Sequence, residues 1–188
     1  MMHLTREAAW SLVTEWTASE QLRRHMLAVE AAMRAYAHRY GEDEELWAVV
    51  GLIHDFDYER HPDLGTDGHP FVGVKYLRDL GVSETITRAI LSHADFSGVR
   101  PESLMERALV AVDELTGFIT AVALVRPSKA IADVEVKSIK KKWKDKVFAA
   151  GVHRDEIERA VEALGVPLDE HIQIVLDAMK ANAAALGL

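Results

Sequence analysis

Hydrophobic residues recur at intervals of three and four along almost the whole chain. This is the spacing of helices that bury one face. One such stripe consists of Leu22, Met26, Val29, Met33 and Tyr36. The few glycines and prolines fall between the periodic segments, where they are typical of helix boundaries. The pattern therefore predicts an all-α protein.

Capping residues set the boundaries of the predicted helices. Ser19 is placed to cap a helix N-terminus and Gly41 to end that helix, and Ser103 with Glu106 fits a capping box. Segment 131–136 alternates valine with acidic residues, and we expect a short extended piece there. We expect helices over residues 5–17, 19–40, 43–53, 70–80, 83–93, 103–124, 136–150, 155–164 and 168–186, with a loop over 56–68.

Composition narrows the possible functions. The 188 residues include no long linker, which favours one domain over 1–188. The chain has no cysteine, so a metal would need nitrogen and oxygen ligands. The net charge of −8 argues against a general nucleic-acid binder. A long apolar run and a secretory signal are both lacking, so we expect a cytoplasmic protein that does not cross a membrane.

Nine histidines are the unusual feature of this composition. His54-Asp55 follows an apolar helix, whose C-terminal partial charge makes a carboxylate unfavourable unless a cation is bound. His25 and His93 lie on buried helical stripes, and Asp113 lies in an apolar helix, where an ionised carboxylate needs a partner or a metal. Imidazole and carboxylate groups together suit a first-row transition metal.

Each of these residues also suits a purely structural role. His25 and His93 suit hydrogen-bonded core histidines, and Asp113 suits an ion pair with Arg88 or Arg107. His69 opens a predicted helix and is equally suited to the surface. The histidines expected at the surface are His3, His38, His61, His153 and His171.

The order His25, His54-Asp55, Asp113 on predicted helices resembles the HD-domain superfamily of metal-dependent phosphohydrolases. The apolar run 51–53 before the His-Asp pair is similar to that family. The resemblance covers residues 21–124. It implies an HD-domain-like helical bundle, with 127–188 as an additional helical extension.

His69 and His93 are similar to the histidines of the binuclear subset of that superfamily. The resemblance then implies His25, His54 and Asp113 on one metal, His69 and His93 on the other, and Asp55 between them. The expected cofactor is one or two divalent ions of iron, manganese, cobalt, nickel or zinc. The chain lacks the Gly-Tyr-Pro signature of the cyclic-dinucleotide branch, which argues against cleavage of cyclic dinucleotides.

Membership of this superfamily implies hydrolysis of a phosphate ester or anhydride of a nucleotide or other small phosphorylated molecule by a metal-activated water. Asp55 belongs to the expected catalytic centre. The candidate proton donors are Asp57, Glu59, His61 and Asp95, each of which also suits a solvated loop. Lys137 and Lys141 are candidates for binding substrate phosphates, and the alternative is a solvated helix face.

Two other function classes fit the same residues. Some relatives with this six-residue pattern are di-iron oxygenases, and oxygen uptake by the iron-loaded protein would identify that activity. The other class is a non-catalytic HD fold that binds or senses a ligand, against which the complete ligand set argues. The sequence leaves the substrate, the metal and the oligomeric state open.

Overall fold

The computed structural model describes residues 4–63 and 65–188. Within these ranges the regular structure is helical, which confirms the all-α prediction. Two short 3-10 helices cover Asp95–Ser97 and Ile131–Asp133. The α-helices are α1 Arg6–Trp16, α2 Glu20–Tyr40, α3 Glu44–Ile53, α4 Phe71–Asp79, α5 Glu84–Ser92, α6 Leu104–Leu124, α7 Val136–Trp143, α8 Arg154–Leu164, α9 Leu168–Ala181 and α10 Ala183–Leu186.

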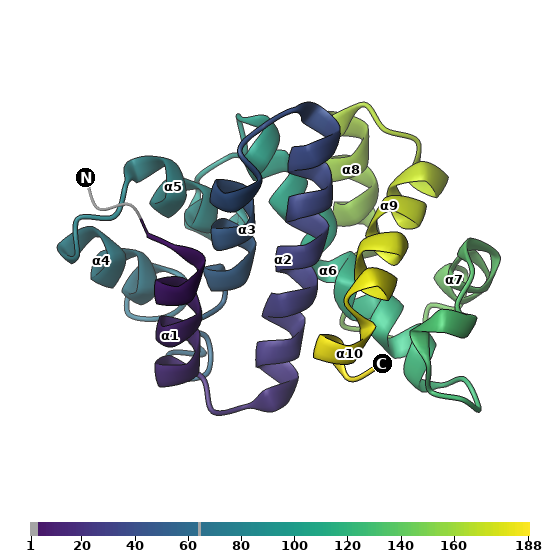
Figure 1. The fold of residues 1–188 in the computed structure, drawn as a ribbon. Helices are drawn as coiled ribbons and strands as arrows, with labels where there is room; N and C mark the ends of the chain where they lie inside the picture. The colour runs from purple at the N-terminus through teal and green to yellow at the C-terminus, as the bar shows by residue number, and fades with distance from the viewer. Residues whose placement is uncertain (1–3, 64) are drawn as a thin grey trace.

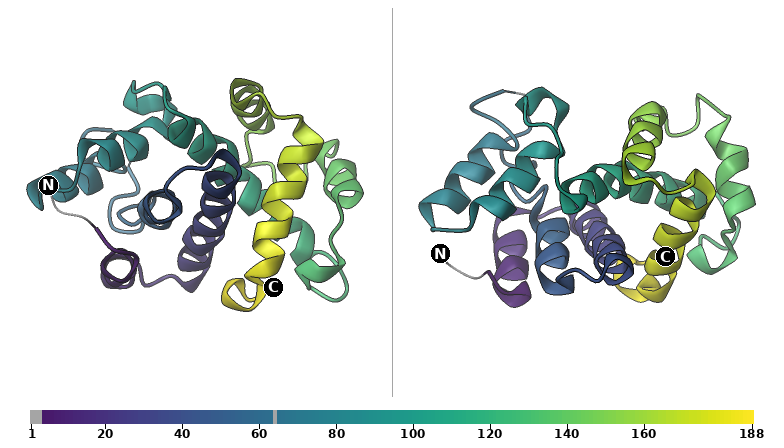
Figure 2. Two further views of the ribbon diagram at one scale, coloured as in Figure 1. Left: turned by 45° about the horizontal axis from the view of Figure 1, so that its top comes forward. Right: turned by 90° about the horizontal axis from the view of Figure 1, so that it is seen from above.

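Helix α2 lies at the centre of the molecule (Figure 1). It packs against α3 on one side and against α6 and α9 on the other. Helices α1, α3 and α2 lie side by side in both views, and α4 pairs with α5 beyond them (Figure 2). Helices α7, α8 and α9 cover the other end. The buried hydrophobic side chains form one cluster, whose largest fully buried members include Tyr36, Phe56 and Phe118.

The caps predicted at Ser19, Gly41 and Ser103 are present. The Ser19 hydroxyl accepts a hydrogen bond from the backbone N–H of Leu22, and Gly41 ends α2 with a left-handed φ of 68°. Ser103 and Glu106 form the capping box of α6. These local bonds satisfy N–H groups that have no partner inside the helix. They explain why the ends of α2 and the start of α6 were predictable.

Three expectations in the C-terminal third are wrong in detail. The helix expected over 136–150 ends at Trp143, because Asp145 Oδ1 accepts hydrogen bonds from the backbone N–H groups of Val147 and Phe148 and favours a turn. The helix expected over 168–186 is interrupted at Asn182. Of the extended piece expected over 131–136, residues 131–133 form a 3-10 turn, and the extended backbone is limited to Val134 and Glu135.

His171 corrects the expectation that five histidines lie at the surface. Its side chain is fully buried between α9, α2 and α6, where the ring bonds the Tyr36 hydroxyl and the Ala111 carbonyl. It lies four residues before the buried Val175, so the helical stripe contained the signal. Of the others, His38 and His153 are exposed and paired with glutamates, His61 is half-buried, and His3 lies outside the described residues.

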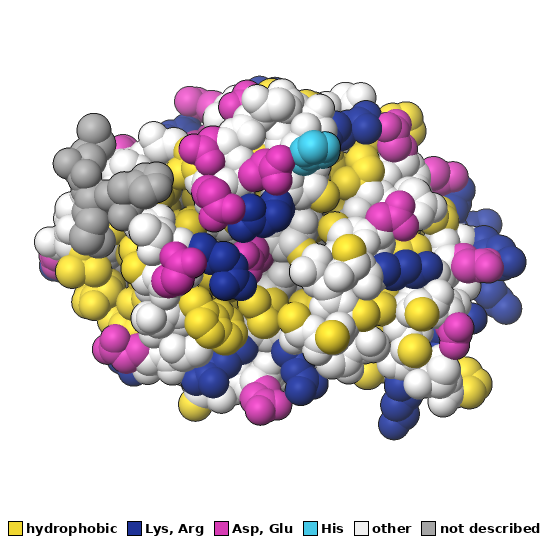
Figure 3. Space-filling model, in the orientation of Figure 1, with side chains coloured by type: hydrophobic (Ala, Val, Ile, Leu, Met, Phe, Trp, Pro, Cys, Tyr) yellow, Lys and Arg dark blue, Asp and Glu magenta, His cyan; other side chains and the backbone are white. Residues whose placement is uncertain are grey.

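The surface carries charges of both signs. Lysine and arginine side chains alternate with acidic ones over the face shown in Figure 3, with hydrophobic side chains exposed between them. No described helix has both the length and the hydropathy that crossing a bilayer requires.

Candidate metal centre

Four helices and one loop bring the six predicted ligand residues together. His25 lies on α2 and Asp113 on α6, while His93 follows directly after α5. His54-Asp55 follows the last turn of α3, and His69 stands just before α4. Residues far apart in the sequence therefore meet in one place, as the order of the motif predicts.

Asp55 lies at the middle of this group. Its Oδ2 atom is 3.5 Å from His54 Nε2 and 3.8 Å from His25 Nε2. Its Oδ1 atom is 3.3 Å from His69 Nε2 and 3.4 Å from His93 Nε2. Each carboxylate oxygen therefore faces a different pair of histidines. His25, His54 and Asp55 form one group of convergent donor atoms, and Asp55, His69 and His93 form a second.

Asp113 completes the first group. Its Oδ1 atom lies 3.0 Å from His25 Nε2 and 3.4 Å from His54 Nε2. The alternative ion pair with Arg88 is excluded, because Arg88 contacts Glu106 and Glu102 instead. Asp113 lies in an otherwise apolar helix and has its partners on other elements, the imidazoles of His25 and His54.

Hydrogen bonds fix the tautomers of three histidines. Nδ1 of His54 lies 2.8 Å from the Gly51 carbonyl, and Nδ1 of His93 lies 2.5 Å from the Ile90 carbonyl. Nδ1 of His69 lies 2.7 Å from the Asp57 carboxylate. Carbonyl and carboxylate oxygens only accept, so each Nδ1 carries the hydrogen and each neutral ring keeps a lone pair at Nε2.

These lone pairs point at one another and at carboxylates. His69 Nε2 and His93 Nε2 are 3.2 Å apart. His54 Nε2 is buried and has no hydrogen-bond partner among the described residues. Acceptors that converge in this way repel unless a positive charge lies between them. The donor set of imidazole nitrogens and carboxylate oxygens fits a first-row transition metal.

The pKa values of His54, Asp55 and Asp113 also indicate that the centre favours positive charge. Burial alone would lower the pKa of His54, but the charges of Asp55 and Asp113 outweigh burial and raise it to about 9. Burial alone would raise the pKa of both carboxyls, but the neighbouring histidines lower each below its ordinary value. The centre therefore keeps its carboxylates ionised. Without a metal, the His54 ring takes up a proton at Nε2 near neutral pH, and a bound cation would replace that proton.

Comparison with known families gives a match at the same residues. The family model described as HD domain matches residues 22–117, just over half of the chain. The chain belongs to the HD-domain family. Most members of this family are metal-dependent hydrolases that bind divalent metals, within a superfamily of phosphohydrolases. Nothing matches the chain among curated proteins or solved structures.

Asp57 lies behind the centre of the HD domain. It is fully buried, so it is not a solvated loop residue. Its Oδ1 atom faces His69 Nδ1, and its Oδ2 atom accepts a hydrogen bond of 2.6 Å from the backbone N–H of Gly73. A Cβ atom at Gly73 would lie 2.6 Å from the Asp57 carboxyl carbon. The absence of a side chain at Gly73 thus permits the contact between Asp57 and His69. The sequence analysis did not identify this role of Gly73.

The loop before His69 is held by its own backbone. The N–H of His69 donates to the carbonyl of His61 at 2.8 Å and closes the loop. A Cβ atom at Gly68 would lie 1.8 Å from the Asp63 carbonyl oxygen, so the loop requires glycine there. The His61 ring packs near Trp16, 6.2 Å between centroids. This arrangement turns His69 inward, so its side chain is buried and does not lie at the surface.

Three other predicted site residues lie elsewhere. Asp95 is exposed and lines a cavity together with Glu156 on α8. Lys137 is exposed and pairs with Glu135 at 2.6 Å. Lys141 is exposed on α7, which packs against α9 and α6. The lysine positions match the solvated helix face that the sequence offered as the alternative.

A pocket of about 700 Å³ opens beside the centre, with His25 in its wall. Its size is typical of small-molecule sites. Its lining comes from the start of α2, the loop after Asp55, the second half of α6 and the C-terminal residues. Of the four candidate proton donors, Glu59 is the one in the described lining.

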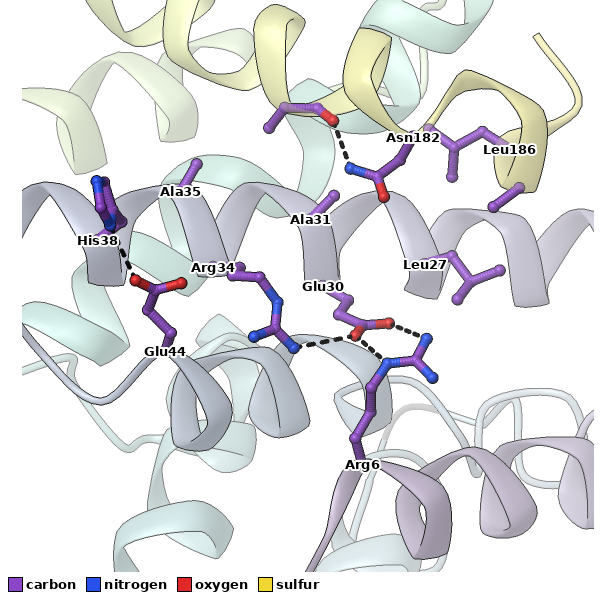
Figure 4. A pocket seen from close by; sticks show the side chains of 12 residues that line it. Arg6, Leu27, Glu30, Ala31, Arg34, Ala35, His38, Glu44, Asn182 and Leu186 are labelled. Carbon is purple, nitrogen blue, oxygen red and sulfur yellow. Dashed lines mark hydrogen bonds and ion pairs between the residues drawn. The ribbon is translucent and has the colours of Figure 1, made fainter.

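A second cavity of about 490 Å³ lies on a different face of α2 (Figure 4). Its buried carboxylate, Glu30, accepts hydrogen bonds from Arg6 at 2.5 and 3.0 Å and lies 3.7 Å from Arg34. The chain itself supplies the positive charge here. This cluster therefore makes no demand for a bound ion, unlike the centre around Asp55.

Proposed function

We propose that this HD domain is a metal-dependent phosphohydrolase that acts on a nucleotide or other small phosphorylated molecule. His25, His54 and Asp113 would hold one divalent transition metal, and His69 and His93 a second, with Asp55 shared by both. The observation that carries the proposal is the convergence of Nε2 lone pairs on the two oxygens of Asp55.

When bound, such metals lower the pKa of a coordinated water and neutralise charge on phosphoryl oxygens. The protein supplies the orientation. The carbonyls of Gly51 and Ile90 and the carboxylate of Asp57 hold three imidazoles with Nε2 turned inward. Such outer contacts fix ring orientation and raise ligand basicity. Asp57 acts here as a positioning residue.

Glu59 is the proton donor that the arrangement supports. It lines the pocket beside His25, and its Oε2 atom accepts a hydrogen bond of 3.0 Å from the backbone N–H of Ser19. Asp57 already uses both oxygens, and Asp95 lines a different cavity. Glu59 therefore combines access to the pocket with a fixed position.

Metal loading and phosphate release test the proposal together. Protein stripped with chelator is reloaded with iron, manganese, cobalt, nickel or zinc, and metal content is measured by elemental analysis. Phosphomonoesters, nucleotides and dinucleotides are then assayed for phosphate release. We expect release that depends on metal and is lost in Asp55→Asn.

The matched control is His171→Gln, which changes a buried histidine outside the centre. It should keep its metal and its activity. Phosphate release that survives chelation would contradict the proposal. So would inactivity across the panel with rapid oxygen consumption by the iron form, which would identify an oxygenase instead.

A further inference from the structure

Gly117 differs from two other helical glycines of the core. A Cβ atom at Gly51 would lie 3.0 Å from the backbone of α2, so glycine is needed where α2 and α3 pack closely. Gly73 makes room for Asp57. At Gly117, a Cβ atom would meet no described atom within 4 Å beyond its own helix. Packing therefore does not explain a glycine in the middle of α6, where it is a poor helix former.

The position of Gly117 in the fold explains why a glycine stands there. It lies one turn after Asp113, so both residues lie on the same face of α6. Gly117 lines the 700 Å³ pocket together with His25, and Thr120 and Leu124 continue the wall along α6. The space in front of Gly117 is therefore the part of the pocket next to the metal centre.

The pocket wall is largely apolar. The charged side chains in it are Arg24 and Glu59, one of each sign. Arg24 also pairs with Glu20 at 3.3 Å, and Glu59 bonds the Ser19 backbone. A chain of several phosphates needs several cations or helix N–H groups, and this wall offers one arginine. The apolar side chains in the wall are those of Leu22, Leu124, Leu186 and Leu188.

We propose that Gly117 keeps this pocket open for the organic group of a phosphate monoester, and that this group is mainly apolar. The inference rests on the proposed phosphohydrolase function and names its substrate class. The phosphate would lie at the centre around Asp55 and the organic group against Gly117 and the leucines. In the reaction, a water oxygen bonds to phosphorus, the bond from phosphorus to the alcohol oxygen breaks, and that oxygen takes a proton.

Binding of non-hydrolysable probes tests this pocket without relying on turnover. Metal-loaded wild type is titrated calorimetrically with 1-naphthylmethylphosphonate, methylphosphonate and imidodiphosphate. We expect the naphthyl probe to bind at least about tenfold more tightly than methylphosphonate, because its rings leave water for an apolar wall. Imidodiphosphate should gain nothing over methylphosphonate from its second phosphoryl group.

Substitutions at Gly117 assign the preference to this residue. Gly117→Leu places a side chain in the part of the pocket next to the metal centre and should abolish the preference for the naphthyl probe. Gly117→Ala should reduce it and raise the melting temperature by about 2–4 °C, because alanine favours the helix. Ala35→Leu is the matched control, since Ala35 lines the second cavity on α2. It should leave all three affinities unchanged.

The outcomes separate this inference from the proposed function. Equal affinities for the naphthyl and methyl probes, or a preference that persists in both Gly117 variants, would overturn the pocket assignment. Tighter binding of imidodiphosphate than of the naphthyl probe would also overturn it. Failure to hydrolyse any ester with any metal, alongside a Gly117-dependent naphthyl preference, would instead refute only the phosphohydrolase.

Discussion

His54 and His171 are both fully buried, but their surroundings give them opposite acid–base properties. Burial would lower the pKa of either ring. At His54 the carboxylates of Asp55 and Asp113 outweigh burial and raise the pKa to about 9. At His171 burial prevails and lowers the pKa to about 4, while the Tyr36 hydroxyl bonds the ring.

The contrast shows what distinguishes a structural histidine from a candidate ligand. Both ring nitrogens of His171 have partners, so the neutral ring joins three helices and is complete without an ion. His54 has one nitrogen bonded to Gly51 and the other buried without a described partner. Burial is the same in both, and the difference lies in which groups converge on the second nitrogen.

The largest effect should come from removing the carboxylate that faces both pairs of histidines. We expect Asp55→Asn to lower metal-dependent phosphate release on the order of 10³-fold, about 4 kcal/mol of transition-state stabilisation. It should also lower the metal-to-protein ratio in elemental analysis. If the variant retains wild-type turnover and metal content, the centre around His54 is not the reacting site.

His171 should dominate a pH-dependent loss of stability. Its pKa is lowered to about 4 from an ordinary value of 6.5, so the unfolded chain binds its proton more readily than the folded one. The free energy of unfolding should therefore fall by about 3 kcal/mol as pH drops from 6.5 to 4, and show no dependence on this group above that window.

Urea unfolding of wild type and His171→Gln at a series of pH values measures this contribution. Glutamine does not titrate, so the variant should lose less stability over the same window. Parallel pH profiles would mean that His171 does not titrate with a lowered pKa.

Metal binding should stabilise the region around His54 directly. A ligand present at a hundredfold excess over its Kd adds about 2.7 kcal/mol to the free energy of unfolding. The melting temperature should accordingly rise by about 5–10 °C on metal addition and return on chelation. In Asp55→Asn this shift should shrink. A shift of full size in that variant would place the stabilising ion elsewhere.

The smallest effect should come from Gly73, which makes room for the Asp57 carboxylate that orients His69. Gly73→Ala pushes a Cβ atom against Asp57 and should loosen the contact that orients the imidazole. We expect about a tenfold loss of affinity for one of two metals, as for other outer contacts. Isothermal titration would show it as one weakened binding event. Lys75→Ala, an exposed change on the same helix, serves as the control.

Much of the fold followed from the sequence. The stripe through Met26 and Tyr36 predicted α2, and the capping box at Ser103 predicted the start of α6. The prediction was wrong after Trp143, where side-chain bonds of Asp145 to the backbone replace a helix that periodicity favours. The expectation that residues 1–188 form one domain stays a prediction.

The residues of the candidate centre also followed from the sequence, because buried ionisable residues on apolar helices need partners wherever they lie. The order of His25, His54-Asp55 and Asp113 was enough to indicate the family. Their assignment as ligands stays a proposal, supported by the distances around Asp55.

Only the tertiary structure decided how these groups act on one another. Periodicity gives the face on which a side chain lies, but not what faces it from another helix. Both His93 and His171 lie on the buried face of a helix by their spacing. The Nε2 atom of His93 faces Asp55, whereas the ring of His171, which the sequence analysis placed at the surface, bonds a hydroxyl and a carbonyl. Long-range packing likewise put Asp57 behind His69 and left open space at Gly117, because both depend on atoms distant in the chain.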